Sequence, residues 1–206
     1  MKSIFRGPSK MDLLRVSTAG KLTSNAFLDD AGKTPSERPR AVIKIARTSL
    51  MTALIAVATM ISIPMPPPLS ALMLAPTMIF VAGILLGPIL ALISSSLGSA
   101  VGYIAGYSVG VISVPPAFVG IFLLGIVVAR GPMGLAVGML RKVNEVAAMI
   151  IGVLVETAIF FVADWYLFGF PTALITLGTL VDLIHVPIAY GVLRGVRRML
   201  KITYLE

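Results

Sequence analysis

The stretch VNEVAAMIIGVLVETAIFFVADWYL, residues 143–167, decides the fold class of this chain. It is almost wholly apolar, and Glu156 is the one ionisable residue in its central part. A helix needs about 20 predominantly apolar residues to cross the hydrocarbon core of a bilayer. The stretch reaches that length, so it predicts a transmembrane helix.

Comparable apolar stretches fill the chain between residues 41 and 200. We expect six transmembrane helices, at residues 41–63, 69–86, 89–110, 116–130, 143–167 and 172–196. Prolines and glycines separate them, and these residues end helices and form turns. A short amphipathic stretch is expected at 132–142, and Pro187 is expected to kink the sixth helix. The predicted fold class is an all-α membrane protein.

The domain organisation follows from where the polar residues lie. Residues 1–37 are polar and lack helical periodicity, which predicts a low-order cytoplasmic tail. No apolar segment follows the first basic residues, so this is not a secretory signal peptide, although a start at Met11 stays open. Residues 38–200 form the predicted six-helix membrane domain, and residues 201–206 form a cytoplasmic end.

Composition excludes several classes of function. The chain is 57% hydrophobic and 13% charged, whereas a soluble domain is about a quarter charged. It has no cysteine and one histidine, and it lacks the GxxxxGK[ST], HExxH and GxSxG patterns. We therefore predict no enzymatic activity, no cofactor and no metal site. The net charge is +8, but the basic residues flank the apolar helices, so a nucleic-acid partner is not expected.

Basic residues assign the sides of the membrane, because they concentrate in cytoplasmic connections. They lie in the N-terminal arm, in the Arg130–Lys142 connection and from Arg194 onward. With six helices and the N-terminus inside, all 17 Lys and Arg are expected on the cytoplasmic side. Both termini are therefore predicted to be cytoplasmic, in a multi-pass protein of the plasma membrane.

Small residues recur at every fourth position of two predicted helices. In the third helix they are Ser94, Gly98, Gly102, Gly106 and Gly110. In the first helix they form two pairs, Ser49 with Ala53 and Thr52 with Ala56. Four-residue spacing places small residues on one helix face, where another backbone can approach closely. Packing against a neighbouring helix is the expected role.

Ionisable residues at membrane depth are costly and indicate functional sites. Glu156 and Asp182 each lie about 11 residues into adjacent antiparallel helices, roughly 16 Å deep. Their carboxyl groups are thus expected at one level, with His185 on nearly the same helix face as Asp182. A polar cavity is predicted there, and a buried structural network is the alternative.

Further candidates lie in the predicted outer half. The full set of candidate substrate-binding residues is Glu156, Asp182, His185, Asp164, Trp165, Tyr103 and Tyr107. The aromatic members could equally be anchors at the membrane interface. Because no Lys or Arg is expected in the outer half, a cationic or neutral ligand is favoured over an anion.

The chain resembles the substrate-binding S components of energy-coupling-factor (ECF) vitamin transporters. The resemblance covers about residues 40–200, with SLMTALIAVA at 49–58, the proline-rich loop from Pro64, and GILLGP at 83–88. A small-residue third helix, the helix at 118–125 and Arg141-Lys142 also look similar.

The resemblance implies a function and partners. In that family an Ala-x-x-x-Ala motif on the first helix docks on a transmembrane coupling subunit, which works with two ATPase subunits. The positions that match here are Ser49, Thr52, Ala53 and Ala56. The family also implies a loop over the ligand at Pro64–Leu69, and ligand contacts from the fifth and sixth helices.

The predicted function is thus a substrate-capture subunit of an ATP-driven importer for a vitamin or related micronutrient. Thiamine-like or other cationic or neutral heterocycles are preferred. Two alternatives stay open: a stand-alone proton-coupled carrier that relays protons through Glu156, Asp182 and His185, and a non-transport assembly subunit of a membrane complex.

Overall fold

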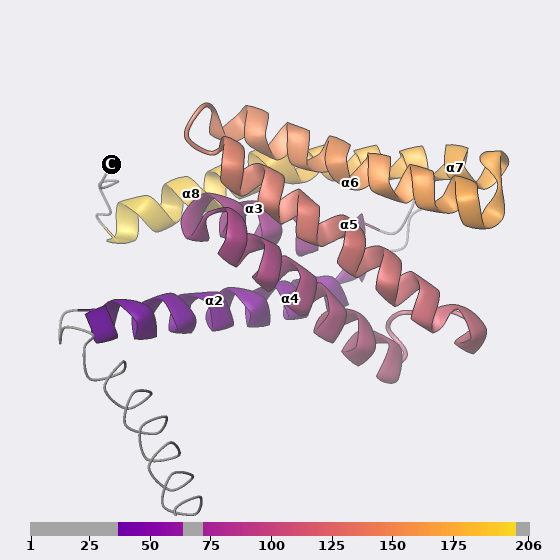
Figure 1. Cartoon of the computed structure of the whole chain (residues 1–206), viewed down its shortest axis with the longest axis horizontal. Helices are drawn as coiled ribbons and strands as arrows, with labels where there is room; N and C mark the ends of the chain where they lie inside the picture. Colours follow the sequence, from indigo (N-terminus) through magenta and orange to yellow (C-terminus); the bar gives the residue numbers. More distant parts are fainter. Residues whose placement is uncertain (1–36, 64–71, 201–206) are drawn as a thin grey trace, which may run out of the picture. The chain divides into compact units, whose positions relative to one another are not determined.

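The computed structural model describes residues 37–63 and 72–200 (Figure 1). Residues 1–36 of the predicted tail, the whole predicted loop at 64–69 and the end at 201–206 lie outside the described residues. The chain divides into two units, residues 1–44 and 45–206. The described part of the first unit is the opening of helix α2, and the rest of this section concerns the second.

Six helical segments lie within the described residues and confirm the predicted fold class. They are α2 (Glu37–Met60), α3 (Ala75–Leu86), α4 (Pro88–Ser108), α5 (Val119–Leu140) after the short η1 (Pro116–Phe118), α6 (Glu145–Phe168), and a last one made of α7 (Phe170–Thr176), η2 (Leu177–Ile184) and α8 (His185–Leu200). Five are long and apolar enough to cross a membrane, and α3 is shorter. Strands β1 (Ser62–Ile63) and β2 (Leu72–Met73) pair antiparallel, with Ser62 opposite Met73.

Turn residues set several helix ends where the sequence predicts them. Gly87 has φ 87° between α3 and α4, and Gly169 has φ 89° between α6 and α7. Glycine adopts such positive φ values without a steric penalty. Asn144 caps α6, because its side-chain oxygen accepts hydrogen bonds from the backbone N–H groups of Val146 and Ala147.

Helix α3 lies among the other helices and carries much of the core. Its residues are buried along most of its length, and it contacts α4, α5 and α8. Twelve residues at 1.5 Å each span about 18 Å, which is less than a hydrocarbon core of about 30 Å. Strand β2 precedes α3, and its non-helical backbone is tolerated at membrane depth where protein surrounds it.

The glycine face of α4 packs against α2, as the sequence predicts. A Cβ atom on Gly98 would lie 2.7 Å from the carbonyl oxygen of Thr52, and one on Gly102 would lie 2.3 Å from that of Ala56. These distances leave no room for a side chain, so the two backbones are in direct contact. Gly106 faces Ile112 instead, and Gly110 has φ 76° just beyond the helix.

Helix α5 differs from the sequence prediction. It does not end at Arg130 but continues through Gly131-Pro132 to Leu140. The prediction of a separate amphipathic stretch at 132–142 is therefore wrong. Gly131 and Gly134 lie directly against side chains of α4, where a Cβ would be within 2.4 Å and 2.5 Å of serine oxygens. Membrane helices tolerate an internal proline when neighbouring helices hold them in place.

The last helical segment is irregular, but the break is not at Pro187. Residues 177–184 form a 3₁₀-helix of eight residues, whereas 3₁₀ runs longer than three or four are uncommon. Thr179 hydrogen-bonds to Thr157 of α6 at 2.9 Å and to the Thr176 carbonyl oxygen at 2.8 Å. Pro187 lies in the first turn of α8, where a helix accepts proline.

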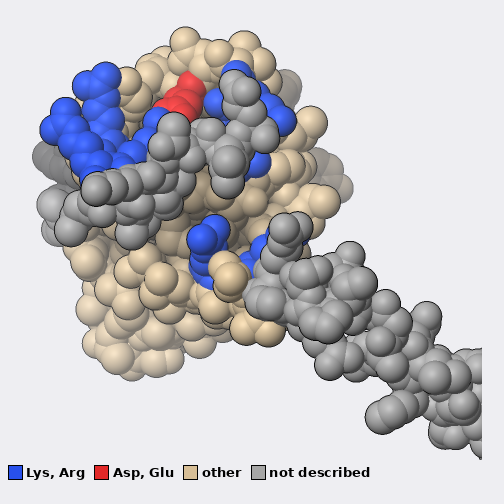
Figure 2. All heavy atoms as spheres, turned by 90° about the vertical axis from the view of Figure 1, so that its left-hand side faces the viewer, with Lys and Arg blue, Asp and Glu red and all other residues tan. Residues whose placement is uncertain are grey.

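Basic side chains gather at the end where α5 and α8 finish (Figure 2). They are Arg141, Lys142, Arg194, Arg197 and Arg198. Arg197 forms an ion pair with Glu145, and Arg141 donates to the carbonyl oxygen of Ile84 at 2.9 Å. This grouping is typical of the cytoplasmic ends of membrane helices.

Candidate functional site

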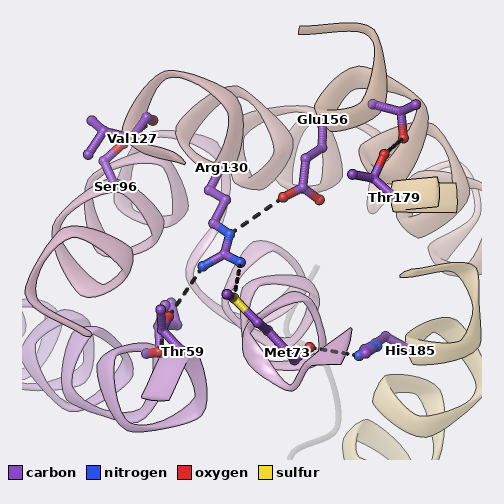
Figure 3. Close-up of polar contacts among 10 residues, drawn as sticks. Thr59, Met73, Ser96, Val127, Arg130, Glu156, Thr179 and His185 are labelled. Atoms are coloured by element: carbon purple, nitrogen blue, oxygen red, sulfur yellow. Dashed lines mark hydrogen bonds and ion pairs between the residues drawn. The ribbon is translucent and has the colours of Figure 1, made fainter. Parts of the chain in front are cut away.

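Arg130 is the centre of a buried polar network (Figure 3). Arg130 is only 5% exposed, and its guanidinium group contacts residues of three other elements. Nε lies 3.5 Å from Oε1 of Glu156 on α6. Nη1 donates to Oγ1 of Thr59 on α2 at 3.4 Å, and Nη2 donates to Sδ of Met73 on β2 at 3.2 Å.

The ion pair between Arg130 and Glu156 compensates two charges that would be costly alone in an apolar interior. It does not use the full hydrogen-bonding capacity of either group. Oε2 of Glu156 and Nε of Arg130 have no hydrogen-bond partner among the described residues, although both are buried. Buried polar atoms are normally hydrogen-bonded, so these two atoms have unused hydrogen-bonding capacity.

His185 lies on the other side of Met73. It is fully buried, and its Nε2 lies 2.9 Å from the carbonyl oxygen of Met73. A carbonyl oxygen only accepts, so Nε2 carries the hydrogen, and Nδ1 of a neutral imidazole is then an acceptor. Nδ1 has no partner among the described residues. The site therefore offers a second unused acceptor.

The predicted convergence of acidic groups and histidine agrees with this geometry. Asp182, in η2, is close enough to Glu156 and Arg130 to interact electrostatically with both. His185 follows η2 directly and begins α8. Glu156 thus pairs with Arg130 directly and His185 contacts Met73, which also contacts Arg130, while the contact of all three predicted residues with a ligand stays a prediction.

Arg130 itself is the residue that the sequence analysis placed wrongly. It lies in the protein interior and not at the cytoplasmic surface, so the assignment of all 17 Lys and Arg to that surface is also wrong. The expectation of no cation near the central carboxyl groups is therefore wrong too, because Arg130 pairs with Glu156. The preference for a cationic ligand rested on that expectation and has no remaining basis. One signal was present: no other charged residue lies between 117 and 140.

A second feature is an aromatic pocket of about 330 Å³ between α5, α6 and α7. Its lining residues are Phe118, Phe122, Asp164, Phe168 and Thr172. The rings of Phe122 and Phe168 are stacked with centroids 6.5 Å apart. Asp164 accepts a hydrogen bond from Thr176. Of the predicted site residues, Asp164 is the one that lines this pocket. No contact between Asp164 and the Arg130 network is found among the described residues.

The predicted aromatic residues make no hydrogen bond to Arg130 among the described residues. Trp165 is 55% exposed and contacts the rings of Phe161 and Phe170, an arrangement that suits a membrane-interface anchor. Tyr103 is buried with Ile112 and Ile126, and its hydroxyl has no partner among the described residues. Tyr107, one turn further along α4, is partly exposed. Ligand contacts of these three residues remain predictions.

Comparison with known families decides the class of this protein. The model of a family described as "ECF-type riboflavin transporter, S component" matches residues 40–196. The chain belongs to this S-component family. No curated protein and no solved structure matches the chain.

Membership establishes the general function. This S component is a substrate-capture subunit of an ECF transporter, a multi-pass protein of the plasma membrane and not an enzyme. S components bind their substrate and work with an ECF module. The carrier and assembly-subunit alternatives are set aside by the family match.

The predicted docking residues of this S component fall on two faces of α2. Ser49 and Ala53 are exposed, together with large apolar neighbours such as Leu50 and Val57. Thr52 and Ala56 face the glycines of α4, where they hold the two helices together. Their use in partner docking stays a prediction, but only the first pair lies on an open face.

Proposed function

We propose that this S component captures riboflavin, or a closely related flavin, at the Arg130 network and delivers it to an ATP-driven importer. The observation that supports the site is the buried pair of Arg130 and Glu156 with unused hydrogen-bonding atoms. The family supports the substrate, since its described members are riboflavin transporters.

The chemistry of the network matches one edge of a flavin. Arg130 offers a donor beside the acceptor oxygen of Glu156, and a ring edge with neighbouring C=O and N–H groups complements that pair. The pyrimidinedione ring of a flavin has such an edge and carries no net charge. A charged ligand would leave one unbalanced charge in this low-dielectric interior, which is costly. A neutral heterocycle is therefore favoured.

The first test is riboflavin binding. We expect a flavin to co-purify with the wild-type protein in mild detergent, detected by mass spectrometry, and added riboflavin to show quenched fluorescence on binding. Glu156→Gln should weaken binding by about 10- to 100-fold, because a hydrogen bond to a charged group contributes about 1.5–3 kcal/mol.

Glu145→Gln is the matched control. Glu145 also lies on α6, but it pairs with Arg197 at the basic end of the bundle, so its substitution should leave riboflavin affinity unchanged. Absence of both co-purified flavin and riboflavin binding by folded wild-type protein would contradict the proposed substrate. Equal losses in the two variants would contradict the proposed site.

We further propose that one transmembrane coupling subunit and two ATPase subunits complete the importer, and that the exposed Ser49–Ala53 face of α2 docks on the coupling subunit. A small-residue face lets two helices approach closely. Ala53→Trp should therefore reduce recovery of the assembled complex by about 10-fold or more, since overpacking costs 1–3 kcal/mol.

The readout is co-purification of the co-expressed subunits with tagged S component, alongside riboflavin binding by the isolated chain. Riboflavin binding should persist in Ala53→Trp, because Ala53 is exposed whereas the buried Thr59 of the same helix contacts Arg130. Ala158→Trp, at an exposed alanine of α6, should leave assembly unchanged. Full assembly of Ala53→Trp would exclude this docking face.

A further inference from the structure

Met73 is held at two points of different strength. Its backbone carbonyl oxygen accepts a hydrogen bond from the fully buried His185 at 2.9 Å, and its backbone pairs with Ser62 across the two short strands. Its side-chain sulfur accepts from Nη2 of Arg130 at 3.2 Å. A carbonyl oxygen is a strong acceptor and a thioether sulfur is a weak one. The backbone is thus firmly placed, and the side chain is not.

The Met73 sulfur is a weak hydrogen-bond acceptor for the charged Arg130 guanidinium. Hydrogen bonds from an ionised donor are about twice as strong as neutral ones when the acceptor is good. A buried donor that faces a thioether forgoes most of that gain. An oxygen acceptor brought by a ligand would compete for Nη2, and the unbranched methionine side chain has the rotatable bonds to move aside.

We propose that the Met73 side chain is a displaceable placeholder: it occupies the position on Arg130 that a carbonyl oxygen of the substrate takes upon binding. This inference rests on the proposed function. It deepens that function by naming the residue that competes with the substrate. The adjacent N–H of the substrate then donates to Oε2 of Glu156, which is buried and has no partner among the described residues.

The placeholder role predicts that truncating Met73 changes substrate affinity in the opposite direction from truncating an ordinary binding-site residue. A side chain that contacts the bound substrate strengthens binding, so its truncation weakens binding. A side chain that must leave competes with the substrate, so its truncation strengthens binding. The backbone contacts to His185 and Ser62 do not depend on the side chain and survive its truncation.

The test measures riboflavin affinity and association rate for the full-length chain. Met73→Ala should tighten binding by about 2- to 10-fold, the range expected when one competing hydrogen bond is removed, and should raise the association rate. Met78→Ala is the matched control. Met78 is also partly exposed, but it packs against the apolar core and should leave affinity unchanged. Weaker or unchanged binding in Met73→Ala would overturn the placeholder.

A second measurement follows the Met73 side chain itself in the wild-type protein. The 11 methionines are labelled with ¹³C at their methyl groups, and Met73→Ala assigns the Met73 signal. Saturating riboflavin should shift and narrow the Met73 signal as the side chain is released, while Met78 stays unchanged. An unchanged Met73 signal would overturn the placeholder alone. Failure of the wild-type protein to bind riboflavin would overturn the proposed function and this inference with it.

Discussion

Arg130→Met is expected to lower the free energy of unfolding by about 3–5 kcal/mol, because it leaves the Glu156 carboxylate buried without its cation. Glu156 is only 2% exposed, so water cannot replace the lost partner. The double variant Arg130→Met/Glu156→Leu should recover most of the loss, since removing both charges of a buried pair is often close to neutral. Thermal and denaturant unfolding in detergent measure all three proteins.

The comparison has an internal control at the protein surface. Arg194 lies exposed on α8, where its guanidinium contacts the ring and hydroxyl of Tyr190. Arg194→Met should change stability by less than about 1 kcal/mol, as expected for an exposed interaction. A double variant no more stable than Arg130→Met would contradict the expected recovery, and with it the cost assigned to the unpaired Glu156 carboxylate.

Gly102→Ala is expected to destabilise the protein by about 1–3 kcal/mol through overpacking. The added Cβ would lie 2.3 Å from the carbonyl oxygen of Ala56 and 2.7 Å from Cβ of Thr59. Both neighbours belong to α2, so the helix must move away from α4. Thr59 also accepts a hydrogen bond from Arg130, and the movement should therefore weaken riboflavin binding as well.

Gly191→Ala serves as the control, because here the same substitution should not lower stability. Gly191 lies inside α8, and a Cβ there would meet nothing within 4 Å. Alanine is up to about 1 kcal/mol more favourable than glycine in a helix interior, so this variant should be neutral or slightly more stable. Unfolding temperatures of both variants in the same detergent provide the test. A Gly102→Ala protein as stable as Gly191→Ala would contradict direct contact between α2 and α4.

The position of Arg130 connects the stability of the bundle with the proposed binding site. Its guanidinium joins α5 to α2, β2 and α6, so the group that would hold a substrate also holds these elements together. A ligand that takes over one of its hydrogen bonds changes the contacts of β2. Substrate binding and the local structure around Met73 are therefore expected to be coupled.

The sequence by itself determined the class of this protein, its six helices and several of their ends. Helix length depends on the thickness of the bilayer, and residues such as Gly87 and Gly169 mark turns through their own backbone preferences. Glu156 and Asp182 also stood out, because a carboxyl group within an apolar stretch is unusual wherever the chain folds. These features are local, so a single sequence suffices to find them.

Only the tertiary structure decided where Arg130 lies and which small residues of α2 remain open. The path of α5 through Pro132 depends on its packing against α4, and the burial of Arg130 depends on Glu156, 26 positions further along the chain. Likewise, Thr52 and Ala56 differ from Ser49 and Ala53 only through the glycines that face them. Contacts between helices decide these features, because the same arginine or alanine suits a surface or an interior until its neighbours are in place.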